Sequence, residues 1–289
     1  MTWRVVVVSS NSKLDLKLNY LVIRSDAVKK IHLSEISVLM IESTAVSMTA
    51  MLLCELSRRK IKVIFCDETH NPYGELMPYN SSHDSPDKLR NQIRWNETVK
   101  SNVWAEIVKE KIRNQSKVAA RYDFERAKQI LNFSDEVLPG DKSNREGHAA
   151  KVYFNTLFGN EFSRKKDCEI NSCLNYGYSI LIAAVNREIT SLGYVTSIGI
   201  FHDNGFNKYN LGSDLMEPLR PLVDSKILEL DEQTLSVDNK HRIAAFLNDT
   251  VIIDGKEQYL MNALRTYVKS VTDSLESGEI DIHFCNYEK

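Results

Sequence analysis

The sequence predicts an α+β protein in which an N-terminal β-sheet domain with one helix precedes a mainly α-helical domain. Before residue 70, apolar residues cluster in short bursts rich in β-branched side chains, which is typical of strands. Beyond residue 90, apolar residues recur every three or four positions, which is typical of amphipathic helices. The length of 289 residues agrees with two domains, at roughly 150 residues per domain.

The N-terminal bursts predict a sheet interrupted by a single helix. They are short and apolar, and they centre on Val5–Val8, the alternating Leu14–Leu18, Ile23, Ile41 and Ile64. Between them, residues 47–60 place apolar side chains at helical spacing, and basic residues close the segment where the helix dipole is negative. We therefore expect a helix over 47–60.

Turn-forming residues gather between Thr69 and Pro86, where Asn, Pro, Gly and Ser are frequent. We therefore interpret residues 1–79 as the N-terminal domain, 80–90 as a linker and 91–289 as the second domain. In the second domain the helical spacing is clearest in three segments, which run from Trp95 to Ile107, from Tyr176 to Leu192 and from Tyr259 to Leu275.

The composition excludes a disordered chain, because 43% of the residues are hydrophobic and only 11 Gly and 6 Pro are present. The 37 basic and 39 acidic residues nearly cancel, so total charge does not indicate nucleic-acid binding. Residues 109–166, however, contain thirteen Lys or Arg against eight Asp or Glu, and residues 224–289 contain seven against thirteen. The basic segment is either a set of ordinary solvated helix faces or a local surface for phosphates.

The cysteines and the N-terminus indicate the cellular compartment. The five cysteines are odd in number and lack CxxC spacing, which argues against a structural zinc site and against a disulfide framework. The apolar run Val5–Val8 is too short for a signal peptide or a membrane span. We therefore expect free thiols and a soluble, cytoplasmic protein with no membrane partner.

Three polar residues could carry chemistry: Glu146, His202 and Glu217. Each also has a purely structural explanation. Ser143 and Glu146 have the spacing of a capping box, in which the carboxylate bonds back to the start of its helix, and Asp214 and Glu217 have the same spacing. His202 follows an apolar segment and precedes a turn, where a histidine is usually a hydrogen-bonded rim residue.

Two carboxylates and one imidazole would suit Mg²⁺ or Mn²⁺, since hard oxygen ligands favour both ions and the nitrogen favours Mn²⁺. An ion held in this way polarises a phosphate and activates a hydroxyl group at neutral pH. Arg220 lies three residues after Glu217 on the same predicted helix. It is therefore either a salt-bridge partner of the carboxylates or a contact for a phosphate.

Several segments together carry a resemblance to a known family. They are Arg145–Gly147 with Tyr153–Phe154, Asn171–Leu181, Gly199–His202 and Asp214–Pro221, in that order. With these motifs the chain resembles the CRISPR-associated integrase, the endonuclease subunit that inserts new spacers during CRISPR adaptation. The resemblance spans nearly the whole chain, and Leu33–Ile36 and Val63–Asp67 resemble the form found in type II systems.

The resemblance implies a set of site residues. Glu146, His202 and Glu217 fall on the family's three metal-ligand positions, so they are expected to be catalytic and to bind Mg²⁺ or Mn²⁺. Asp214 and Arg220 fall on the accompanying acidic and basic positions.

Three further residues follow from the same resemblance. Asn175 and Tyr176 match a family segment beside the active site, although Asn175 is also explained by a local hydrogen bond and Tyr176 by burial in the core. Phe201 departs from the family pattern, because many members have a second histidine before the ligand histidine.

The resemblance further implies partners and an activity. The N-terminal domain would form a homodimer, and dimers would flank a small ferredoxin-like partner and hold double-stranded DNA, both the captured fragment and the CRISPR repeat. The type II effector nuclease and an accessory adaptation protein are further expected partners. The helical domain would be catalytic, and a 3'-hydroxyl would attack a phosphodiester of the repeat. Two alternatives stay open: a general metal-dependent DNA nuclease, and a non-enzymatic DNA scaffold whose glutamates are only helix caps.

Overall fold

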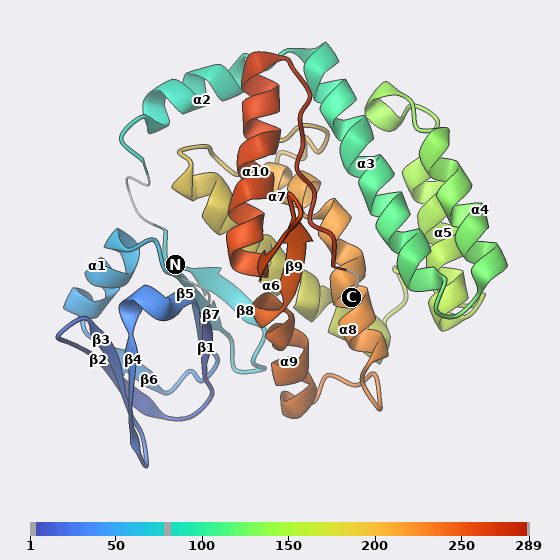
Figure 1. The fold of residues 1–289 in the computed structure, drawn as a ribbon. Coiled ribbons are helices and arrows are strands. Elements are labelled where there is room, and N and C mark those ends of the chain that lie inside the picture. Colours follow the sequence, from blue (N-terminus) through green and yellow to red (C-terminus); the bar gives the residue numbers. More distant parts are fainter. Residues whose placement is uncertain (1–3, 78–81, 288–289) are drawn as a thin grey trace.

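The computed structural model describes residues 4–77 and 82–287. Two four-stranded sheets and one helix form the N-terminal part, and helices dominate the rest of the chain (Figure 1). The N-terminal elements are β1 (Arg4–Val8), β2 (Ser12–Lys17), β3 (Tyr20–Arg24), β4 (Val28–His32), η1 (Leu33–Glu35), β5 (Ile36–Ile41), β6 (Val46–Met48), α1 (Ala50–Arg58), β7 (Lys62–Cys66) and β8 (Pro72–Glu75). The predicted α+β class is confirmed. The helix expected over 47–60 is present as α1, but it is shorter, because Ser47 and Met48 belong to β6.

The first sheet has the order β1-β5-β7-β8, and the second has the order β4-β3-β2-β6. In the first sheet β5 lies between two parallel neighbours, with Leu39 opposite Val6 of β1 and Val63 of β7. A parallel strand covered on both faces is expected to be apolar throughout. Every residue of β5 is buried, and four of its six are Ile, Leu or Val.

The residues of β5 alternate between two hydrophobic cores. Leu39 and Ile41 belong to the N-terminal core, which lies between the two sheets and α1, whereas Val38 and Met40 belong to the core of the helical part. This alternation follows from the two-residue period of a strand. The first sheet is therefore the layer on which the helices rest.

The helical part is built around α6 (Glu169–Ser191), most of whose residues are buried. Asn96 starts the long helix α3 by accepting hydrogen bonds from the amides of Thr98 and Val99, as an N-cap residue does. The other elements are α2 (Ser85–Ile93), α3 (Glu97–Ala119), α4 (Phe124–Asp135), η2 (Pro139–Asp141), α5 (Arg145–Phe158), α7 (Asn210–Leu215), η3 (Glu217–Leu219), α8 (Arg220–Leu228), α9 (Val237–Ala244), η4 (Ala245–Asn248), β9 (Thr250–Ile253), β10 (Lys256–Tyr259) and α10 (Leu260–Ser277).

Three features differ from the expectations. The turn-rich segment contains β8, which pairs antiparallel with β7, and α2 occupies the second half of the predicted linker 80–90. The hairpin of β9 and β10 was not predicted. The proposed boundary after residue 79 falls within residues 78–81, outside the described part of the chain. Across the described segments, the search for a helix long and apolar enough to cross a bilayer finds none.

Candidate active site

Glu146 lies in the first turn of α5, but it does not cap that helix. The carboxylate of Asp141 takes the capping role, because it accepts hydrogen bonds from the amides of Arg145 at 2.8 Å and Glu146 at 3.0 Å. The Ser143 hydroxyl donates instead to the carbonyl oxygen of Glu136. The capping-box interpretation of Ser143 and Glu146 is therefore wrong, and the Glu146 side chain is available to other partners.

The second capping interpretation fails as well. Asp214 lies inside α7, and its fully buried carboxylate points back to the loop before that helix. Glu217 begins η3 and is only 2% exposed. Burial of an isolated carboxylate is costly, so Glu217 requires cationic partners.

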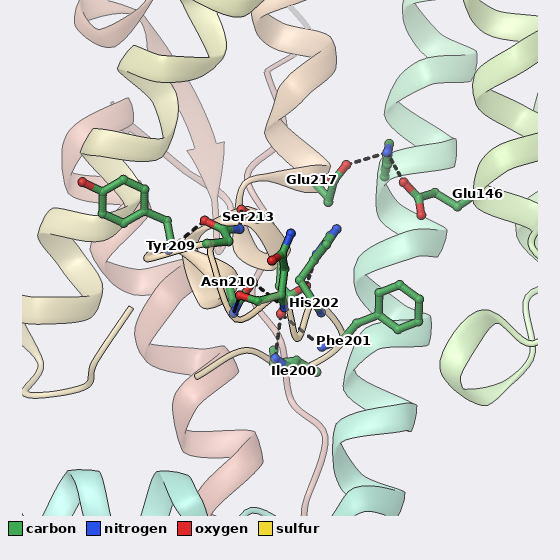
Figure 2. A network of polar contacts seen from close by, with 12 residues as sticks. Glu146, Ile200, Phe201, His202, Tyr209, Asn210, Ser213 and Glu217 are labelled. Carbon is green, nitrogen blue, oxygen red and sulfur yellow. Dashed lines mark hydrogen bonds and ion pairs between the residues drawn. The ribbon is translucent and has the colours of Figure 1, made fainter. Parts of the chain in front are cut away.

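Lys111 of α3 is one such partner, and it joins Glu217 to Glu146. Its ammonium lies 2.5 Å from Oε1 of Glu146 and 2.5 Å from Oε2 of Glu217. Figure 2 shows the two glutamates facing each other across this ammonium, one from α5 and the other from η3. Two carboxylates from separate elements thus meet at a single cation position.

Lys111 was missed in the sequence, although a signal was present. Trp104, Ile107 and Val108 form the buried face of α3, and Lys111 continues that face at helical spacing. A lysine at an apolar-face position is seldom buried without a paired charge. Such a position therefore indicates a buried carboxylate partner.

Asp214 organises the loop that carries His202. Its two oxygens accept hydrogen bonds from the amides of Ile200, Phe201 and His202 at 2.6 to 3.1 Å, and one of them lies 2.6 Å from Nδ1 of His202. Gly199 is required at the start of the loop, since a Cβ there would lie 2.7 Å from Oδ2 of Asp214. Both Asp214 oxygens are therefore committed to protein donors.

The bond to Asp214 fixes the tautomer of His202. A carboxylate at Nδ1 requires a proton on that nitrogen, which leaves Nε2 with its lone pair in the neutral ring. The same hydrogen bond raises the pKa of His202 above its ordinary value, with further contributions from the negative charges of Glu217 and Glu146. The structure thus brings His202 within electrostatic range of both glutamates without a direct bond to either.

The aromatic ring of Phe201 lies beside the histidine, where many family members have their second histidine. Phe201 stacks on Trp104 of α3 with the ring centroids 4.5 Å apart, and its side chain remains half exposed. Trp104 also meets the His202 ring edge-on, at 5.9 Å between centroids. The helix that supplies Lys111 thus supports the histidine loop as well.

Arg220 pairs with the remaining oxygen of Glu217. Its guanidinium lies 2.9 Å from Oε1 of Glu217 and stacks over the ring of Tyr178, 4.7 Å from the ring centroid. Burial alone would raise the pKa of Glu217, but the charges of Arg220 and Lys111 outweigh it and hold that pKa below its ordinary value. Glu217 is therefore an anion in spite of its burial. The salt-bridge interpretation of Arg220 holds in this structure.

Asn175 and Tyr176 have different positions. Asn175 accepts a 2.7 Å hydrogen bond from Arg164, which lies over the same Tyr178 ring as Arg220. Tyr176 lies two positions before Tyr178 on α6 and therefore faces the opposite side of the helix. Its hydroxyl contacts Met40 of β5, so Tyr176 is a core residue, which was its alternative explanation.

The cluster is suited to a divalent cation but is arranged around an ammonium. Within residues 4–77 and 82–287, no three His, Cys, Asp or Glu side chains gather closely enough to hold a metal ion. The donor set nevertheless fits Mg²⁺ or Mn²⁺: two carboxylates converge on one cation position, and an imidazole whose Nδ1 is held by a carboxylate lies within electrostatic range of both. The metal-ligand roles of Glu146, His202 and Glu217 stay a prediction.

Sequence comparison finds relatives over most of the chain. The family model described as CRISPR associated protein Cas1 matches residues 5–249. The CRISPR-associated endonuclease Cas1 of Neisseria meningitidis serogroup C (strain 8013) is 37% identical over 235 residues, which are 81% of this chain and 77% of the relative.

Solved structures share the fold at lower sequence identity. A Cas1 protein from Thermotoga maritima superposes with a TM-score of 0.77 at 17% identity, over 99% of this chain and 100% of its own. A casposase bound to integration product gives a TM-score of 0.74 at 19% identity, over 98% of this chain and 92% of its own.

A chain of a Cas6-RT-Cas1–Cas2 complex superposes with a TM-score of 0.71 at 18% identity. The superposition covers 96% of this protein but only 35% of that larger chain. The two-part architecture thus recurs in these structures. From the match over residues 5–249 and the identity to the Neisseria endonuclease, the chain belongs to the CRISPR-associated Cas1 family.

Proposed function

We propose that this protein is a metal-dependent DNA integrase that inserts captured foreign DNA fragments into a CRISPR array as new spacers. The observation that carries the proposal is the convergence of Glu146 and Glu217, from separate elements, on one cation position, with a carboxylate-held histidine within electrostatic range of both. A site of this composition is expected where phosphodiesters are broken and formed.

The proposed reaction is a transesterification. The 3'-hydroxyl oxygen of the captured fragment bonds to a phosphorus at the end of a repeat, and the bond from that phosphorus to the adjacent 3'-oxygen breaks. The proton of the attacking hydroxyl passes to solvent, and the released 3'-oxygen takes up a proton from solvent to become a new 3'-hydroxyl. The number of phosphodiester bonds is conserved, so the site needs to orient the reactants and stabilise charge.

The residues of the chain have distinct tasks in this proposal. Glu146, Glu217 and the Nε2 atom of His202 would hold Mg²⁺ or Mn²⁺, and Asp214 keeps Nδ1 protonated so that Nε2 is free. When bound, the ion supplies Lewis acidity to the phosphate and lowers the pKa of the attacking hydroxyl. Arg220 keeps the buried Glu217 anionic.

The comparisons support the biological setting. The relatives in Neisseria and Francisella are named CRISPR-associated endonucleases, and the casposase of the same fold is described bound to integration product. Another neighbour belongs to a complex with Cas2, which supports a small partner subunit for this chain. We extend the proposal to a homodimer that binds double-stranded DNA. The type II form, the type II effector and an accessory adaptation protein as partners, and a cytoplasmic location stay predictions.

Replacement of the proposed ligands tests the proposal. Glu146→Ala and His202→Ala should each abolish strand joining in the presence of Mn²⁺ or Mg²⁺ and the small partner, while fragment binding stays near the wild-type level. Glu125→Ala is the matched control, because Glu125 is an exposed glutamate on the neighbouring helix α4 that pairs only with Lys128 among its described ionic contacts. Wild-type joining by either ligand variant would reject the assignment.

A general DNA nuclease is the second candidate, because the same three residues would suffice with water as the nucleophile, and because the relatives carry the name endonuclease. The products separate the two functions. Branched joined strands indicate an integrase, whereas shortened fragments alone indicate hydrolysis. The scaffold alternative required both glutamates to be helix caps, which neither of them is.

A further inference from the structure

Lys111 lies at the centre of the cluster and has an unusual set of contacts. Its side chain is 8% exposed, and its ammonium is 2.5 Å from a carboxylate oxygen of Glu146 and 2.5 Å from one of Glu217. Among the described residues, its side chain makes polar contacts with these two carboxylates and no other group. The ammonium therefore occupies the point at which the two glutamates converge.

A divalent ion would need the same oxygens. Of the two oxygens of Glu217, Oε1 is paired with Arg220 at 2.9 Å and Oε2 with Lys111, so neither oxygen is without a cation. Because Glu217 is 2% exposed, an incoming ion cannot be added at a solvent-facing side of the carboxylate. One of the two protein cations has to give up its oxygen when an ion binds, since cations at that spacing repel each other strongly.

The other contacts of the two cations decide which one leaves. Arg220 is held a second time by the Tyr178 ring, 4.7 Å from its guanidinium, and a stacked guanidinium keeps part of its stabilisation when one ion pair is lost. Lys111 has a flexible stem, and its polar contacts in the described structure are the two carboxylates that the ion would take. Lys111 is therefore the more easily displaced cation.

We infer that the Lys111 ammonium holds the place of the divalent ion in the metal-free protein and is expelled when the ion binds. Without a cation between them, Glu146 and Glu217 would repel each other in a site of low polarity. Lys111 thus stabilises the metal-free site and, for the same reason, weakens metal binding. The inference rests on the proposed function only in that a divalent ion binds to these carboxylates.

The test measures Mn²⁺ binding by the full-length chain in the absence of DNA, by isothermal titration calorimetry. Lys111→Met removes the competing charge and keeps an unbranched apolar stem, so we expect Mn²⁺ to bind about tenfold more tightly or better than to the wild type. Without metal, the melting temperature of Lys111→Met should fall below that of the wild type, and the rise on adding saturating Mn²⁺ should be larger.

Lys109→Met is the matched control. Lys109 lies on the same helix, two residues away, and pairs with Glu106 at 2.7 Å at a partly exposed position. Its replacement should leave both the Mn²⁺ affinity and the metal-induced rise in melting temperature at the wild-type values.

The outcomes separate this inference from the proposed function. If Lys111→Met binds Mn²⁺ with wild-type affinity or more weakly, the ammonium does not compete with the ion and the inference fails, whereas the metal site stands. If the wild type and every variant bind no Mn²⁺, the metal-dependent function itself fails. Should Lys111→Met not fold, Lys111→Gln provides the same comparison, because its neutral amide still donates hydrogen bonds between the two glutamates.

Discussion

Two buried carboxylates seven residues apart, Glu217 and Asp224, have opposite surroundings. Glu217 is 2% exposed and meets the cations Arg220 and Lys111, whereas Asp224 is 1% exposed and accepts hydrogen bonds from the hydroxyls of Tyr153 at 2.9 Å and Tyr178 at 2.5 Å. The cations hold the pKa of Glu217 below its ordinary value, while burial raises the pKa of Asp224 to about 6.

The difference shows how buried carboxylates acquire two different roles. The neutral hydroxyl donors satisfy the hydrogen bonds of Asp224 but do not stabilise its negative charge as water would. Its hydrogen bonds with Tyr153 and Tyr178 connect α5, α6 and α8, which is a structural role. The full positive charges of Arg220 and Lys111 keep Glu217 anionic, so a divalent cation can compete with them for its carboxylate oxygens. Burial alone therefore does not identify a catalytic carboxylate, but the charge of its partners does.

The largest contrast is expected in strand joining. Glu217→Gln removes a proposed ligand charge and should lower joining roughly 100- to 1,000-fold, the loss typical of removing one electrostatic group from an active site. Asp224→Asn alters only the scaffold network and should retain joining within about tenfold of wild type. Both variants are assayed with the partner subunit and Mn²⁺. Equal losses in the two variants would erase the distinction between the two carboxylates.

A smaller effect is expected from the residue that orients His202. In Asp214→Asn the amide NH₂ facing Nδ1 would favour the tautomer protonated at Nε2, so joining should fall about 10- to 100-fold. The pKa of His202, followed by NMR, should fall as well because its hydrogen-bonded anion is lost. Asp203→Asn, an exposed change in the same loop, is the control and should alter neither quantity. An unchanged histidine pKa in Asp214→Asn would contradict the orienting role.

The last effect concerns the pH dependence of folding stability, which does not involve joining. The folded-state pKa of Asp224, about 6, lies above its ordinary value of 3.8, so between these values the folded state holds a proton that the unfolded chain has released. The resulting stabilisation, about 3 kcal/mol, is complete below about pH 4 and is lost as the pH rises through about 6. The free energy of unfolding is measured in urea for the wild type and for Asp224→Asn at a series of pH values, and the difference between the two should show this decline. A difference that rises or stays flat between pH 4 and 6 would contradict it.

Most of the fold was predictable because its strands are strongly patterned. β1, β5 and β7 each contain an uninterrupted run of four apolar residues, as strands of a covered parallel sheet typically do; the runs are Val5–Val8, Val38–Ile41 and Val63–Cys66. β8 was missed because it contains Pro72 and Gly74, which are typical of turns but are tolerated in a strand at the sheet edge. The β9–β10 hairpin had a signal that we did not use: Asp254 and Gly255 have positive φ angles of 52° and 71°, as a two-residue Asp-Gly turn requires.

The candidate site was predictable in part. The family motifs pointed to Glu146, His202 and Glu217, and the spacing rules suggested helix caps that the structure does not contain. The predicted caps are absent for two reasons. Asp141 accepts the amide hydrogen bonds at the start of α5, and Asp214 accepts hydrogen bonds from the loop before α7 rather than from the residues after it. The local spacing of residues does not encode either contact. Lys111 was missed because its role depends on contacts with residues 35 and 106 positions away in the sequence. The only indication in the sequence was that Lys111 lies on the apolar face of α3.

The alternation of β5 between two cores has a consequence for anyone who wishes to divide this protein. A fragment ending near residue 79 would uncover the sheet face that bears Val38, Met40, Ile64 and Cys66, all of which now lie under the helices. An uncovered apolar sheet face of this kind promotes aggregation. Split reporters, fusions and circular permutants of this protein should therefore keep the sheet and the helices that cover it in the same polypeptide.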